Sequence, residues 1–100
     1  MPKVKHTVLL KFKTDTTPEQ IDQVFSELLD ISESIPGIED YVSGPNNSTQ
    51  GLSNGYTHAL IMTFTDAAAR DAYLSNAEHK AFEEKALSLV DSVVVVDFEV

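Results

Sequence analysis

The sequence predicts an α+β domain in the order β-α-β-β-α-β, a split βαβ arrangement with one four-stranded antiparallel sheet and its helices on one face. Residues 3–13 and 56–65 alternate between two kinds of side chain with period two, which is typical of strands with two different faces. Residues 18–35 instead repeat their apolar positions every three or four residues, as an amphipathic helix does. The chain closes on the β-branched run "VVVVDFEV", which favours a last strand.

The first strand, residues 3–13, has one plainly apolar face. Every second residue is expected to point toward the core, namely Val4, His6, Val8, Leu10 and Phe12. The other face carries mostly lysine, and its least polar positions are Thr7 and Leu9.

A helix is expected to begin after Thr17. Thr17 is the predicted N-cap, Pro18 takes the first helical position, and Gln20 completes a capping box. The pair Pro36 and Gly37 ends the helix. Its buried side is predicted to hold Ile21, Val24, Phe25, Leu28, Ile31 and Ile35.

A short strand at residues 38–43 and a long strand at residues 56–64 are predicted on either side of a loop. The loop, residues 44–55, reads "GPNNSTQGLSNG", which is rich in turn-forming residues and has no period. In the long strand the large residues share one face: Tyr56, His58, Leu60, Met62 and Phe64.

Two helices are predicted between the third and the last strand. Asp66 caps a short helix that contains Tyr73, and Asn76 caps a second helix over residues 77–89. His79 shares the buried side of the second helix, because Phe82, Ala86 and Leu89 follow it at spacings of three, seven and ten.

With both helical segments on one face, the other face of the sheet is left open. We expect this face to have a partly apolar centre and a charged rim, and a second copy of the chain to cover it as a two-fold dimer. The expected centre is Thr7, Leu9, Ala59, Ile61, Val93 and Val95, and the expected rim is Lys3, Lys5, Asp97 and Glu99. The alternation of the last strand also allows the opposite set to be buried: Val94, Val96, Phe98 and Val100.

Composition excludes several classes of function. With 100 residues, 42% apolar content and no cysteine, the chain is expected to form one domain, residues 1–100, without disulfides or thiolate metal sites. A net charge of −9, with four of the seven cations in the first 13 residues, leaves no continuous basic surface for nucleic acid. No apolar run approaches the roughly 20 residues that span a bilayer, and no secretory signal pattern is visible. We therefore expect a cytoplasmic protein with no membrane partner.

Five stretches together resemble the stress-responsive α/β-barrel domain family, over nearly the whole chain: "KHTVLLKFK", "IPGI", "GYTHALIMTF", "AYLSNAEHKAF" and "VVVDFEV". The resemblance implies a ferredoxin-like subunit, a homodimer whose two sheets enclose a central barrel, and a pocket between sheet and helices in each subunit. In a polyketide-cyclase branch of the family, the catalytic tyrosine and histidine correspond to Tyr73 and His79. The pocket histidines of that branch correspond to His6 and His58, and its chemistry needs no metal or cofactor.

Tyr73 and His79 form a chemically coherent pair. A neutral imidazole can remove a proton next to a carbonyl group, and a phenol can donate a hydrogen bond to the enolate oxygen that develops. The alternative is that both side chains only pack at the joint of the two helices. We predict a ligand pocket lined by His6, Val8, Leu10, Phe25, His58, Leu60 and Phe82, with no cofactor.

Three alternatives to this chemistry stay open. Convergence of His6, His58 and His79 would suit a metal, although no ligand-spaced pair supports one and no metal is predicted. The leading hypothesis for function is a homodimer that binds a small apolar carbonyl compound, with His79 and Tyr73 as acid/base groups. A non-enzymatic stress-related assembly protein and a cofactor-independent monooxygenase are the competing hypotheses.

Overall fold

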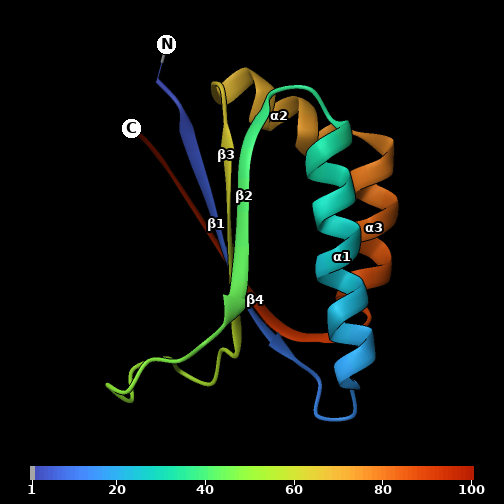
Figure 1. Cartoon of the computed structure of the whole chain (residues 1–100), viewed down its shortest axis with the longest axis vertical. Helices are drawn as coiled ribbons and strands as arrows, with labels where there is room; N and C mark the ends of the chain where they lie inside the picture. The colour runs from blue at the N-terminus through green and yellow to red at the C-terminus, as the bar shows by residue number, and fades with distance from the viewer. Residues whose placement is uncertain (1) are drawn as a thin grey trace.

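The computed structural model describes residues 2–100 and has the ferredoxin-like α+β fold (Figure 1). Four strands form one antiparallel sheet in the order β2-β3-β1-β4, and the helices cover one of its faces. The elements are β1 (Val4–Phe12), α1 (Pro18–Ser34), β2 (Ile38–Pro45), β3 (His58–Phe64), α2 (Ala67–Ser75), α3 (Ala77–Leu87) and β4 (Val90–Glu99).

The predicted signals at the ends of the helices are present. Thr17 accepts a hydrogen bond from the backbone of Gln20, whose side chain in turn accepts one from the backbone of Thr17, so the capping box is complete. Asp66 accepts from the backbone of Ala69 and thereby caps α2. The helix α3 ends at Leu87, two residues earlier than expected, and the long strand begins at His58 because Tyr56 is held in a turn by Ser53.

The core lies between the sheet and α1, with α2 and α3 closing the same side. Met62 and Phe64 of β3 are fully buried, and Val24, Leu28 and Ile31 form the buried side of α1. All five inward residues predicted for the first strand are buried, because β1 is a central strand that the helical layer covers.

The faces of β4 differ from the expectation. The pairing of β1 with β4 places Val93, Val95 and Asp97 opposite Leu10, Val8 and His6, and residues paired in an antiparallel sheet point to the same face. These three side chains therefore lie on the helix side. Glu99, opposite Val4, lies there too.

The open face of the sheet instead takes the alternative set from β4. One row of side chains crosses all four strands on this face: Val42, Ile61, Thr7 and Val96. Phe98, paired with Lys5, lies in the next row. The exposed fractions of Ile61, Val96 and Phe98 are 37%, 57% and 53%, so an apolar surface is left uncovered in the single chain.

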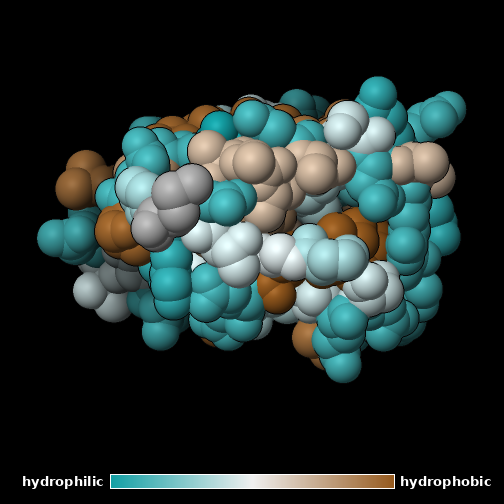
Figure 2. All heavy atoms as spheres, turned by 90° about the horizontal axis from the view of Figure 1, so that it is seen from above, coloured by the Kyte–Doolittle hydropathy of each residue, from teal (hydrophilic) through white to brown (hydrophobic). Residues whose placement is uncertain are grey.

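Figure 2 views the molecule from the end where α2 lies. The outer edge of the helical layer is mostly hydrophilic in this view, and hydrophobic residues reach the surface in separate patches on the sheet side and near the middle. Within residues 2–100, no helix combines the length and the apolar character that crossing a membrane requires.

Candidate functional site

A pocket of about 280 Å³ lies between the sheet and the helices. Its floor comes from β1 and β4, and its walls come mainly from α1, from the α2–α3 joint and from α3. Seven predicted site residues line it: His6, Val8, Leu10, Leu60, Tyr73, His79 and Phe82.

The joint between α2 and α3 places Tyr73 and His79 side by side. Tyr73 lies in the last turns of α2, and Asn76 then ends that helix and caps α3 through hydrogen bonds from the backbone N–H groups of Glu78 and His79. The sharp change of direction brings the two ring centroids to 4.1 Å. Both side chains are almost fully buried, at 2% and 6% exposed.

One ring nitrogen of His79 has no close hydrogen-bond partner. Among the described residues no group has hydrogen-bond geometry toward its buried Nδ1 atom, although the backbone carbonyl of Leu74 lies near enough to the ring to favour its protonated form. Its Nε2 atom lies 3.8 Å from a carboxylate oxygen of Glu83, one turn further along α3. A buried polar atom without a partner costs free energy, so it is best explained by a water or ligand that completes it.

Burial sets the protonation of both groups. It lowers the pKa of His79 below its ordinary value of 6.5, with His6 acting in the same direction and Glu83 opposing it. Burial likewise raises the pKa of Tyr73, with further contributions from Glu83 and Tyr41. At neutral pH the pair is therefore an uncharged imidazole, able to accept a proton, and a protonated phenol, able to donate a hydrogen bond.

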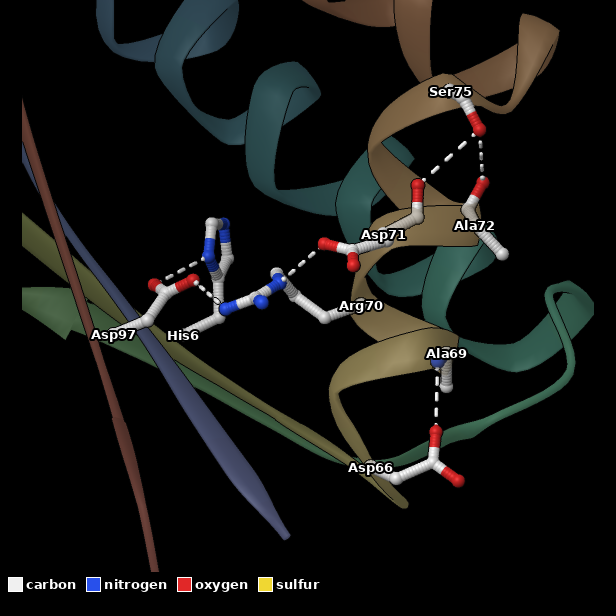
Figure 3. Close-up of polar contacts among 8 residues, drawn as sticks. All are labelled: His6, Asp66, Ala69, Arg70, Asp71, Ala72, Ser75 and Asp97. Carbon is white, nitrogen blue, oxygen red and sulfur yellow. Dashed lines mark hydrogen bonds and ion pairs between the residues drawn. The ribbon is translucent and has the colours of Figure 1, made fainter.

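A chain of polar contacts fixes a second imidazole in the same pocket (Figure 3). His6 Nδ1 lies 2.8 Å from Asp97 Oδ1, and Arg70 Nη1 donates to Asp97 Oδ2 at 3.0 Å. Arg70 Nε also donates to Asp71 at 2.9 Å. Because a carboxylate only accepts hydrogen bonds, Nδ1 of His6 is the donor in this contact, and the contact fixes the orientation of the ring.

Sequence reasoning missed Asp97 as a site residue. It was assigned to the rim of the open face, whereas the register of β4 turns it toward His6. The alternation of β4 did not decide this, because both faces of the strand carry valines. The observed parity turns Asp97 inward and places Phe98 with Ile61 on the open face.

Two predicted pocket residues, Phe25 and His58, lie elsewhere. They stack on each other with ring centroids 5.5 Å apart, and both form T-shaped contacts with Phe12. His58 lies on β3, on the side of β1 away from β4, whereas the pocket floor is formed by β1 and β4. It also pairs with Leu10, four residues along β1 from His6, which is about 13 Å at the usual strand rise.

The three histidines therefore do not converge. Within residues 2–100, no cluster of three histidine or acidic side chains has the geometry of a metal site. His6 and His79 share the pocket, and His58 belongs to the separate aromatic cluster with Phe12 and Phe25.

Two curated proteins are similar to the chain over almost its full length. It is 29% identical to the stress-response A/B barrel domain-containing protein HS1 of Arabidopsis thaliana, with 96% of the chain and 88% of the relative covered. It is 26% identical to olivetolic acid cyclase of Cannabis sativa, with 95% and 94% covered.

Among solved structures, a dimeric ferredoxin-like protein of unknown function from Jannaschia sp. matches with a TM-score of 0.88. The identity is 27%, and the match covers 98% of this chain and 99% of that one. A family model, the Stress responsive A/B Barrel Domain, matches residues 4–100. With this match over nearly its whole length, the chain belongs to the stress-responsive A/B barrel domain family.

Proposed function

We propose that the protein is a homodimer that binds a small, largely apolar carbonyl compound in the pocket between sheet and helices and acts on it by cofactor-free acid/base chemistry. The observation that carries this proposal is the buried, unpartnered Nδ1 atom of His79 beside Tyr73. The similarity to olivetolic acid cyclase, a cyclase by its name, supports a ring closure as the reaction, and we propose that the closure is of the aldol type.

In the proposed reaction His79 removes a proton from the carbon next to a carbonyl group. The electron pair of that C–H bond forms an enolate, whose oxygen accepts a hydrogen bond from the phenol of Tyr73. The enolate carbon then attacks a second carbonyl carbon of the same molecule, and the resulting alkoxide takes the proton from the imidazolium of His79. Atoms and charge balance without any added reagent.

The proposed dimer covers the open face of the sheet. Its apolar row crosses all four strands, and Ile61 lies near its centre. Exposed apolar surface of this kind is typical of an interface between copies. The dimeric state of the Jannaschia protein, which has the same fold, supports this arrangement.

The test of the chemistry is a cyclisation assay with linear poly-β-keto compounds, in which liquid chromatography with mass detection follows the conversion of the linear compound into a cyclic aldol product of the same mass. We expect His79→Ala to lower turnover by at least about a hundredfold, the usual contribution of a general base. His58→Ala is the matched control, since it removes an imidazole outside the pocket and should leave turnover within about twofold. Equal turnover by His79→Ala and the wild type would remove His79 from the mechanism.

Absence of turnover with every compound of this class, in a wild-type protein that is folded and dimeric, would instead favour the non-enzymatic alternative. In that case the protein would serve as an assembly module, and the apolar open face would be its functional surface.

A further inference from the structure

The pocket changes from polar to apolar along its floor. Three pairs of inward side chains from β1 and β4 follow one another, and the distance from the first pair to the last is about 13 Å at the usual strand rise. In order, the pairs are His6 with Asp97, Val8 with Val95, and Leu10 with Val93.

The wall formed by α3 changes in the same direction. His79 stands in its first turn, close to Tyr73 and to the His6 end of the floor, since the ring centroids of His6 and Tyr73 are 6.1 Å apart. Ala86 and Leu87 line the pocket at the other end of the helix, about 10 Å further along its axis. A ligand that fills this space needs one polar end and one apolar arm.

Only two charged side chains line the described pocket, and both are acidic: Asp97 and Glu83. Arg70 contacts Asp97, but it is not among the lining residues, and it already donates to Asp97 and to Asp71. The polar end therefore offers a ligand two imidazoles, a phenol and two carboxylates, of which Asp97 is already paired with Arg70, and no free cation among the described lining residues.

We infer that the pocket selects an uncharged carbonyl compound with a single apolar arm. It rejects ligands whose polar end is a carboxylate or a phosphate, because Glu83 repels them and no described lining residue offers a free cation. The inference rests on the proposed ligand-binding function of the pocket and adds the charge and orientation of the ligand. The carbonyl oxygen lies at the end with His79 and Tyr73, and the arm lies along Val8, Leu10 and Val93. A carboxylate in the same position loses hydration in a largely apolar pocket and faces the like charge of Glu83, while Arg70 is already paired with Asp97.

A matched pair of probes tests this selectivity. The ¹⁵N-labelled protein is titrated at pH 7.5 with 2-octanone and, separately, with octanoate, which has the same chain length and a negative head. Amide shifts give the two dissociation constants, and we expect 2-octanone to bind at least about tenfold more tightly, as the cost of burying a carboxylate without a cationic partner predicts. Shifts confined to residues of the pocket place the bound probe there.

The variant Glu83→Gln assigns the effect to the pocket. Removing this charge should strengthen octanoate binding roughly threefold and leave 2-octanone within about twofold; the gain is modest because the Glu83 side chain is 52% exposed and partly screened. Glu84→Gln is the control, because it makes the same change in net charge at the next position of α3, outside the pocket. It should leave both dissociation constants unchanged.

The outcomes separate this inference from the proposed function. Octanoate binding as tightly as 2-octanone would overturn the inference and leave the pocket function standing. An equal gain in octanoate binding from Glu84→Gln would show that net charge, and not the pocket, rejects anions, which also overturns it. Failure of both probes to bind would refute the ligand-binding proposal and the inference with it.

Discussion

Asp97 shows how much one residue contributes to the site. One of its oxygens accepts from His6 and the other from Arg70, so it connects β1, β4 and α2 in a single polar network. The side chain is only 20% exposed, and a carboxylate so placed needs such partners to offset its lost hydration. The network holds the ring of His6 in one orientation at the polar end of the pocket.

At the same scale, acid should destabilise the fold through His79 and His58. Burial lowers the pKa of both imidazoles from 6.5; Glu83 opposes this shift at His79 and Asp22 opposes it at His58. As the pH falls below about 6.5, the unfolded chain binds protons that the folded chain does not. The contribution of these two histidines to the free energy of unfolding is therefore fully present above about pH 6.5 and is lost as the pH falls through their lowered pKa values. We expect a lower urea midpoint at pH 5.5 than at pH 7.5.

Single variants show which histidine causes this pH dependence of stability. His79→Gln should reduce the difference between the two midpoints, and His58→Gln should reduce it independently, because the two imidazoles lie in different clusters. Carboxylates titrate mostly below pH 5.5 and change the comparison little. If both variants keep the full wild-type difference, neither histidine is the source.

At the scale of the elements, Gly37 sets the distance between the β2 end of the sheet and α2. It follows α1 with φ of +91°, and a Cβ atom built there would lie 2.7 Å from the Cβ of Ala69 in α2. Its carbonyl also accepts a hydrogen bond from Thr65, just before α2 begins. A side chain at this position would therefore strain the backbone and push α2 away from the sheet.

Gly37→Ala should lower the free energy of unfolding by more than Gly51→Ala. Both glycines have positive φ, but nothing lies within 4 Å of a Cβ at Gly51, so the control carries only the backbone cost of about 1 kcal/mol. At Gly37 the contact with Ala69 adds to it, and we expect a total of about 2–3 kcal/mol in urea denaturation. Equal losses in the two variants would mean that α2 moves freely to accommodate the methyl group.

At the scale of the whole molecule, the helices cover one face of the sheet and leave the other face exposed. The helical layer covers the core, whereas the opposite face of the sheet carries Val42, Ile61 and Val96 in one exposed row. Lys3 and Lys5 mark the polar edge of this face through contacts with Glu39 and Thr63. The proposed dimer would bury this row.

Ile61→Lys should therefore yield a monomer in sedimentation-velocity experiments, because a charge buried at the centre of an apolar interface has no partner. Leu29→Lys is the control: Leu29 is similarly exposed, at 47%, but it lies on α1 in the opposite layer. It should leave the sedimentation coefficient unchanged. A dimeric Ile61→Lys variant would place the interface elsewhere on the molecule.

The sequence by itself determined the element order, the helix caps, the inward face of β1 and the neighbouring positions of Tyr73 and His79. These features depend on contacts between residues only a few positions apart, such as Thr17 with Gln20 and Asn76 with His79. The local sequence pattern therefore predicts them.

Only the tertiary structure decided which side of β4 faces the pocket and which histidines share it. β4 is valine-rich on both faces, so its alternation alone is ambiguous, and a shift of one residue exchanges the faces. The pairing with β1 resolved it and turned Asp97 inward, toward His6 and Arg70. In the same way, antiparallel register placed His58 opposite Leu10 and away from His6, because distance along a strand depends on the pairing of two distant segments.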